Sequence, residues 1–568
     1  GGGGGGDGPG DPGTPQALVI DVDSIEASGQ FLLNGLPFPP NPLDAAEFRL
    51  RGGDGGTAIL GATTAGTFSR PIVAGTYDVV YAATAPGAAA PLNPDIVVRA
   101  ATDLTADLTF DPDAPTVAVT PVFLWNGGAF PANPADFGEF HLVPVLGGAS
   151  VLIGRSDVAP VPVNVVPGLY DVEWRYVMGP TVPHNERAVI LPGVPLFGNF
   201  VLPINVLSVN CVATLFLDGA PFPGAPGEQG RMLLRKPGLP DRVDLGTTNA
   251  GPALVQPVVA GVYDVVYTHE AGVVVPRNED AVVAANVPIN AVTPAFMVPV
   301  MTSSVGLQPT LNGGAFPGGT EQGDLWLRGA TTADAFPVGS TNGPFPPIRV
   351  VRGNYDVLYR WVSGVVVPRN ANAVVKPTIA VQVNLAVPVD VPTIALTPDF
   401  RLNGGGFPAS LFDTATISLG GLTAGDVFPI GRTHLAETPV AIIAGNYAVL
   451  YDADAATVEV PLNRGKVLDP GVHLVAAQTL TVNVTGRRVD VALRLDGVPF
   501  PVGPGTAANI LLEDPATKLR FLLMDSSASS LKPAMLIPGT YDSVYDALAE
   551  PTTVPNNHGS VVDTVTVL

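Results

Sequence analysis

Cysteine is almost absent from this chain of 568 residues, in which Cys211 is the single example. One cysteine excludes an intramolecular disulfide framework. Cys211 lies in the strand-like run 209–213, where we expect a small buried hydrophobic residue. Runs of 18 apolar residues are also missing, which excludes a membrane-spanning helix.

Basic residues are scarce as well. Lys and Arg number 28 against 50 Asp and Glu, which gives a formal net charge of −22. Nucleic acid requires a basic face, so the charge balance excludes nucleic acid as a partner. Acidity of this kind keeps an exposed protein soluble and attracts divalent cations.

Patterns typical of catalytic sites are missing too. The histidines show no His-x-x-x-His pairing, and they are scattered over four repeats: His141, His184, His269, His434, His473 and His558. No nucleophile elbow, phosphate loop or dinucleotide-binding glycine pattern precedes a helix. We therefore predict that the chain is not an enzyme and has no resident cofactor.

What the chain does contain is one repeated unit of about 92 residues, written six times. A period this long fits a whole small domain rather than a solenoid turn. Its strongest strand has the pattern Gly-x-Tyr-x-Val-x-Tyr, and its two aromatic columns are Tyr77 and Tyr81, Tyr170 and Trp174, Tyr263 and Tyr267, Tyr355 and Tyr359, Tyr447 and Tyr451, and Tyr541 and Tyr545. Residues i and i+4 of a strand share a face, so each pair points into one core.

Strand signals dominate every repeat. Phe400 and Leu402 alternate with Arg401, as a half-buried strand requires. Asn-Gly or Asp-Gly follows this strand, as at Asn34-Gly35, and supplies the positive φ of a tight hairpin. With about seven short strands per repeat, the sequence predicts an all-β protein of six tandem antiparallel β-sandwich modules.

We place the predicted modules at residues 17–109, 110–201, 202–295, 296–386, 387–479 and 480–568, after a flexible Gly-rich tether at residues 1–16. The joints between modules contain proline, as at Pro112 and Pro115, and no Ser/Gly-rich linker. Proline stiffens such joints, so we expect an extended, semi-rigid rod.

The Gly-x-Tyr-x-Val phrase resembles that of carboxypeptidase-regulatory-like and transthyretin-like (Ig-like) sandwiches. The Gly-rich N-terminal segment is similar to the tether that follows the lipid-modified cysteine of bacterial surface lipoproteins. Together these resemblances imply an extracellular or outer-surface location, with the membrane reached only through an N-terminal lipid anchor. Such sandwiches mostly act as spacers, anchors or binding modules.

A loop of pattern Val-Pro-x-Asn, with small variations, follows each tyrosine strand. Its asparagines are Asn93, Asn185, Asn278, Asn370, Asn463 and Asn557. Each Asn either contacts a ligand or the neighbouring module, or locks its own turn by bonding nearby backbone. We favour the local role, because the residue before the Asn varies freely. At that position Arg277 and Arg369 are candidates to brace adjacent modules.

Two further interpretations concern ligands. The pairs Asp21/Asp23 and Asp111/Asp113 offer oxygen ligands for Ca²⁺ at module junctions, but no further ligands follow at a recognisable spacing. The paired tyrosines would stack on sugar rings if they were exposed, although their position between valines favours the core.

The sequence thus predicts a structural protein, acting as a stalk, an adhesin shaft or a filament subunit. The run Ala17–Val22 matches Ala386–Val391 at an internal joint, so we expect chains to associate head-to-tail or to bind other surface proteins. The alternative is a multivalent polysaccharide-binding array.

Overall fold

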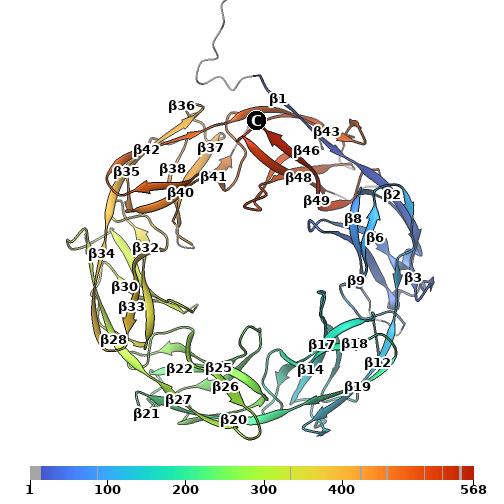
Figure 1. Ribbon diagram of the computed structural model, residues 1–568, viewed down its shortest axis with the longest axis horizontal. Helices are drawn as coiled ribbons and strands as arrows, with labels where there is room; N and C mark the ends of the chain where they lie inside the picture. The colour runs from blue at the N-terminus through green and yellow to red at the C-terminus, as the bar shows by residue number, and fades with distance from the viewer. Residues whose placement is uncertain are drawn as a thin grey trace, which may run out of the picture.

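The computed structural model describes residues 14–85, 87, 89–332, 334–421, 425–455, 458–503, 506–527, 529–548 and 553–568. The chain forms six β-sandwiches arranged in a closed, flat ring around a central opening (Figure 1). Sandwiches and an all-β chain were predicted, and both are confirmed. The predicted tether at residues 1–16 lies almost entirely outside the described residues.

Each sandwich begins with an opening strand, which runs into a hairpin. The opening strands are β2 (Ser24–Gln30) with β3 (Leu32–Leu33), β12 (Val117–Trp125), β20 (Ser208–Leu217), β28 (Thr302–Leu311), β35 (Thr393–Leu402) and β43 (Arg487–Leu495). Short return strands follow the hairpins: β4 (Leu36–Pro37), β13 (Gly128–Ala129), β21 (Ala220–Pro221), β36 (Gly405–Gly406) and β44 (Val498–Pro499). The predicted hairpin geometry is confirmed at Asn34 and Gly35, whose φ angles are 55° and 73°.

Three strands then lead to the tyrosine strand. The second strands are β5 (Ala46–Gly52), β14 (Phe137–Pro144), β22 (Gln229–Arg235), β29 (Gln322–Gly329), β37 (Thr414–Gly421) and β45 (Ala508–Glu513). The third strands are β6 (Thr57–Ala62), β15 (Val151–Arg155), β23 (Arg242–Thr247), β30 (Ala335–Ser340), β38 (Val427–Arg432) and β46 (Arg520–Asp525). The fourth strands are β7 (Thr67–Val73), β16 (Val163–Val165), β24 (Ala253–Val259), β31 (Ile348–Val351), β39 (Val440–Ile443) and β47 (Leu531–Leu536). The first module also contains two 3₁₀ turns, η1 (Pro42–Asp44) and η2 (Thr63–Ala65).

Three more strands complete each unit. The tyrosine strands are β8 (Gly75–Ala83), β17 (Gly168–Met178), β25 (Gly261–Ala271), β32 (Gly353–Ser363), β40 (Gly445–Ala455) and β48 (Gly539–Ala547). The sixth strands are β9 (Ile96–Leu104), β18 (Ala188–Leu196), β26 (Ala281–Ile289), β33 (Ala373–Val381), β41 (Lys466–Leu474) and β49 (Asn557–Val567). The closing strands are β10 (Leu108–Thr109) with β11 (Asp113–Ala114), β19 (Phe200–Val206), β27 (Ala295–Val300), β34 (Leu385–Val391), β42 (Gln478–Val484) and β1 (Gln16–Val22).

Two sheets pack face to face in every module. In the second module the inner sheet has the antiparallel order β15-β14-β17-β18, and the outer sheet places β12 between β16 and β19. The closing strand β19 runs parallel to the opening strand β12, a pairing that the sequence analysis did not predict. Figure 1 shows the sheets that contain the tyrosine strands on the inside of the ring and the opening and closing strands along its rim.

The sixth sandwich takes its closing strand from the other end of the chain. Strand β1 pairs in parallel with β43 over seven residues, from Gln16 opposite Val489 to Val22 opposite Leu495. Leu18, Ile20 and Val22 are buried in the core of this sandwich. The sequence analysis placed residues 17–22 in the first module, whereas their pairing places them in the sixth.

The predicted extended rod is therefore wrong. Proline at the joints limits local flexibility but does not fix the angle between neighbouring modules. In the structure each joint is tied twice, by the continuous chain at the rim and by a loop docked on the inner side. Six similar bends complete the circle. No helix in the described ranges is long and apolar enough to cross a membrane.

Candidate functional site at the module junctions

The six loop asparagines lie at the six junctions and bond to the following module. Each side chain is at most 1% exposed. Its Oδ1 accepts a backbone N–H four residues before the next tyrosine: Val166 to Asn93 (2.8 Å), Val259 to Asn185 (2.7 Å), Val351 to Asn278 (2.7 Å), Ile443 to Asn370 (2.8 Å), Ile537 to Asn463 (2.8 Å) and Val73 to Asn557 (2.8 Å). The favoured interpretation, an Asn side chain that locks its own turn, is wrong.

The same asparagines donate Nδ2–H to the first tyrosine of the next module. The pairs are Asn93 and Tyr170 (3.1 Å), Asn185 and Tyr263 (2.9 Å), Asn278 and Tyr355 (2.9 Å), Asn370 and Tyr447 (3.0 Å), Asn463 and Tyr541 (2.8 Å), and Asn557 and Tyr77 (3.1 Å). Each tyrosine hydroxyl in turn donates to the carbonyl four residues before it, as Tyr355 does to Val351 at 2.6 Å. Asn, Tyr and one backbone residue thus form a closed triangle of hydrogen bonds. We call this unit the junction triangle.

Burial keeps the tyrosine hydroxyl of each junction triangle in its neutral, protonated form. Desolvation raises the pKa of the phenols of Tyr77, Tyr170 and Tyr447 to about 12, although the bond from the Asn amide offsets part of this effect. A buried polar group without a partner costs stability, so each member of the triangle needs the other two.

The residue before each Asn docks through its backbone N–H, and Asn556 also donates from its side chain to the Ile59 carbonyl at 2.7 Å. This backbone N–H donates to the fourth strand of the next module, for example from Arg277 to the Arg349 carbonyl and from Arg369 to the Ala441 carbonyl, both at 2.9 Å. Leu92, His184, Leu462 and Asn556 make the equivalent bond. This explains why the side chain at that position varies freely while the loop still docks.

At three junctions the loop Asn also bonds a buried aspartate that the sequence analysis missed. Asp241, Asp334 and Asp426 accept an N–H from the side chains of Asn185, Asn278 and Asn370, at 2.8, 2.5 and 2.9 Å. Each also accepts backbone N–H groups from the docked loop, such as Ala371 to Asp426 at 2.9 Å. Burial raises the pKa of Asp241. The signal in the sequence was an Asp 21 or 22 residues before three of the six tyrosines.

The ring closes through the same chemistry as the internal joints. At the rim, the Gly497 N–H donates to Asp21 Oδ1 at 3.1 Å, as the Gly313 N–H does to Asp390 at 2.8 Å. The Ser24 N–H donates to Asp496 Oδ1 at 2.7 Å, which matches the bond from Thr393 to Asn312 at 2.8 Å. On the inner side, β49 adds two residue pairs with β6, so one eight-stranded sheet crosses this junction.

The two aromatic columns lie in the cores of the sandwiches, and all twelve side chains are buried. The second column braces the loop of its own module, because Tyr81 donates to the Pro91 carbonyl and Trp174 to the Pro183 carbonyl, both at 2.9 Å. Tyr267, Tyr451 and Tyr545 make the same bond. Buried rings cannot stack on sugars.

Of the four aspartates considered for Ca²⁺, Asp21, Asp111 and Asp113 bind backbone N–H groups through their carboxylates. Asp111 Oδ1 accepts the Gln30 N–H at 2.8 Å and Asp113 Oδ1 accepts the Gly35 N–H at 3.1 Å, both within the first module. Asp21 belongs to the ring closure, and the Asp23 carbonyl accepts the Ala74 N–H at 2.9 Å. Among the described residues no three His, Cys, Asp or Glu side chains converge as a metal site would need.

The face of the inner sheets that points away from the core carries paired charges. Strand alternation places Arg328 there opposite Asp356 (2.9 Å), and Arg231 beside Glu270 (2.6 Å). Arg175 with Glu173, and Arg520 with Glu513, repeat the arrangement in the second and sixth modules. Figure 1 places these sheets on the inside of the ring, so both positive and negative side chains lie on the side of the central opening.

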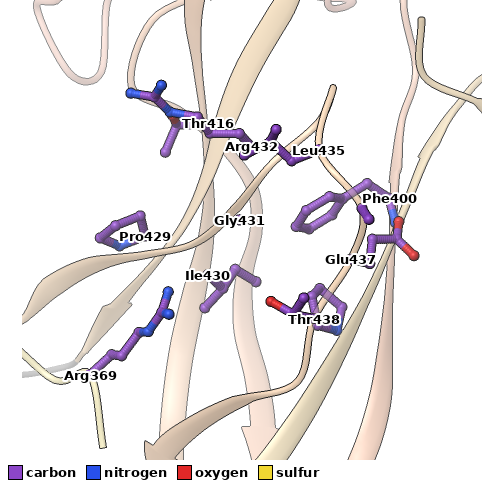
Figure 2. A pocket seen from close by; sticks show the side chains of 12 residues that line it. Arg369, Phe400, Thr416, Pro429, Ile430, Gly431, Arg432, Leu435, Glu437 and Thr438 are labelled. Atoms are coloured by element: carbon purple, nitrogen blue, oxygen red, sulfur yellow. The ribbon is translucent and has the colours of Figure 1, made fainter. Parts of the chain in front are cut away.

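Arg369 also lines a cleft of about 400 Å³ at the fourth junction. Figure 2 shows Arg369 and Arg432 on one side of this cleft and Phe400 on the other. The carboxylate of Glu437 accepts the Phe400 N–H at 2.6 Å and so covers the unpaired edge of β35. Neither Arg277 nor Arg369 forms an ion pair with another described residue.

No family model and no curated protein matches this chain. The solved structures that match this chain include two B repeat units of the Staphylococcus aureus collagen-binding protein, at 12% identity over 65% of this chain and 99% of that one, with a TM-score of 0.14. A streptococcal ancillary pilin matches at 11% identity over 47% of this chain and 95% of its own, with a TM-score of 0.17. The pilus adhesin SpaC from Lactobacillus rhamnosus GG matches at 10% identity, over 62% of this chain and 56% of that one, with a TM-score of 0.14.

These are bacterial surface proteins, and the likeness is distant. The chain spans little more than half of the adhesin's length. At such TM-scores the resemblance says nothing about the ring or about function.

Proposed function

We propose that this chain is a non-enzymatic structural protein of the cell surface or extracellular space, and that its working form is the closed six-module ring. The observation that carries the proposal is the completion of the sixth sandwich by β1. Closure occupies the open side of β43, which would otherwise leave an unpaired edge ready to bind other strands. The chain thereby becomes a circular frame with a central opening.

The junctions give this frame its rigidity. At each joint, one or two residues connect a closing strand to the next opening strand. A docked loop and a buried junction triangle hold the same joint on its inner side. A fixed joint repeated six times holds a constant curvature, which a chain of flexibly linked modules would lack. A ring cannot supply the reach of a rod, so the closed form does not fit a stalk or an adhesin shaft.

The surface location rests on the resemblance of the sandwich phrase and of the Gly-rich N-terminal segment. Attachment through a lipid at that segment belongs to the same proposal. A polysaccharide-binding array has lost its main support, because the paired aromatic residues are buried.

Small-angle X-ray scattering of the full chain and of an Ile20→Asp variant tests the proposal. Ile20 is fully buried under the rim of the sixth sandwich, so a charge there should release β1 and open the ring. We expect the native chain to scatter as a hollow ring and the variant to have a larger radius of gyration. Val19→Asp is the matched control, because Val19 is 43% exposed and should leave the ring closed. A native chain with the scattering of a rod would overturn the proposal.

A further inference from the structure

We propose that a second copy of this chain is a binding partner, and that two copies associate by exchanging β1. This inference rests on the proposed ring. In the exchanged form, β1 of one copy completes the sixth sandwich of another, and the sixth junction forms between chains.

The first support is the local character of the closure. Strand β1 connects to β2 through the single residue Asp23. The backbone pairing and hydrogen bonds of β1 with the sixth sandwich involve residues of β43, its hairpin and the end of β49, and its buried side chains pack into the core of that sandwich. The chain that connects β1 to β43 runs through the first five modules. A sixth sandwich from another copy therefore offers β1 an identical site.

The second support is the inner half of the same junction. Asn557 accepts the Val73 N–H and donates to the Tyr77 hydroxyl, and the Asn556 N–H donates to the Pro71 carbonyl. Val73, Tyr77 and Pro71 belong to the first module, which is covalently connected to β1 and therefore moves with it. Both halves of the junction therefore transfer together, and nothing in the contact distinguishes a partner in the same chain from one in another.

The third support is that, among the described strands, β1 is connected to β2 alone, so release of β1 and of the inner contact frees this joint without unfolding a module. Closing strand β34 has the same register on β28 as β1 has on β43, but it is tied at both ends to β33 and β35. Its release would require unfolding of a neighbouring module. Exchange through β1 produces larger closed rings or, if the circle does not close, an open filament.

Concentration decides between the two forms. Within one chain the modules hold β1 beside its site at a high effective concentration, so dilute protein favours the closed monomer. The fraction of exchanged chains increases as the chain concentration approaches this effective concentration. Exchange also requires that β1 is transiently released from its own sixth sandwich.

Thiol trapping in the full-length chain tests the inference. Val19 and Ala492 are direct partners in the β1–β43 pairing. We would prepare Val19→Cys, Ala492→Cys and the double variant. All variants also carry Cys211→Ala, because unfolding would expose the native thiol, which is buried only in the folded chain.

The double variant reports on the ring itself. Oxidised at high dilution, it should form a disulfide within one chain. Absence of that disulfide would contradict the ring, and with it the proposed function, before any question of exchange arises.

An equimolar mixture of the two single variants reports on exchange. After unfolding and joint refolding at high concentration, we expect a covalent dimer joined through the introduced thiols at positions 19 and 492, identified by peptide mass. The matched control is a mixture of Pro388→Cys and Gln308→Cys, which are partners at the internal β34–β28 pairing. We expect the control to yield at least tenfold less of its mixed dimer. If the double variant closes within one chain but the mixture yields no more than the control, the exchange inference is wrong and the ring stands.

Discussion

Asn557 donates a hydrogen bond of 3.1 Å to the hydroxyl of Tyr77, which lies 480 positions earlier in the chain. The same bond joins Asn278 to Tyr355, only 77 positions apart. The equivalence of these two contacts means that the ends of the chain meet as consecutive modules do. The ring is therefore built from one junction used six times.

Shortening Ile20 should weaken the ring closure without unfolding the other modules. Ile20→Ala removes buried methyl groups beneath β43 and should cost about 2–5 kcal/mol at the sixth sandwich. Hydrogen exchange should then accelerate in residues 487–495 far more than in 393–402, the equivalent opening strand of the fifth module. Equal acceleration in both strands would show that Ile20 does not act through local closure.

Removing one junction asparagine should destabilise the joint it serves. Asn278→Ala leaves the buried Val351 N–H without its acceptor and removes one of three N–H donors from the Asp334 carboxylate, at a cost of about 1–3 kcal/mol. Chemical denaturation would measure this loss. Arg277→Ala is the control and should change stability by less than about 0.5 kcal/mol, since Arg277 contributes its backbone N–H. A larger effect in the control would show that the guanidinium braces the modules.

High pH should open the junctions. The pKa values of Tyr77, Tyr170 and Tyr447 are raised to about 12, against an ordinary value of 10.0. A raised pKa means that the neutral phenol stabilises the folded state. This stability is fully present below pH 10 and is lost as the pH rises through about 12, by roughly 2–3 kcal/mol per tyrosine. Tyrosinate absorbance and circular dichroism should change together above pH 11; ionisation of all twelve tyrosines near pH 10 with the fold intact would contradict the account.

Low pH should loosen the loops that lead into the Val-Pro-x-Asn turns. Backbone N–H groups of Val365, Val366 and Val367 bond to the Glu321 carboxylate and lower its pKa. A carboxyl group with a lower pKa in the folded state stabilises the fold at pH values above its pKa in the unfolded state, which is about 4.3. This stabilisation is lost as the pH falls through the pKa of the folded state. Glu321→Gln should therefore raise amide exchange at residues 365–367 at pH 7 and reduce its pH dependence. Unchanged exchange in the variant would exclude this role.

Much of each sandwich could be predicted because its signals are local. Alternation placed Tyr355 and Tyr359 on one face, and both are buried. Asn-Gly marked the hairpins, and φ is positive at Asn312 and Gly313. These features depend on residues within one turn or one strand.

The junctions could not be predicted in the same way. Asn185 reaches its tyrosine 78 positions along the chain, and its local surroundings alone favoured a turn-locking role. The match between Ala17–Val22 and Ala386–Val391 did indicate a joint at the N-terminal end. Whether that joint forms within one chain depends on the bend between modules, which docked side chains set and no single segment encodes.

Negative-stain electron microscopy of the purified full chain at high dilution tests the central claim most directly. The account predicts closed rings of six densities around an open centre. Extended rods, or arcs with separated ends, would contradict it.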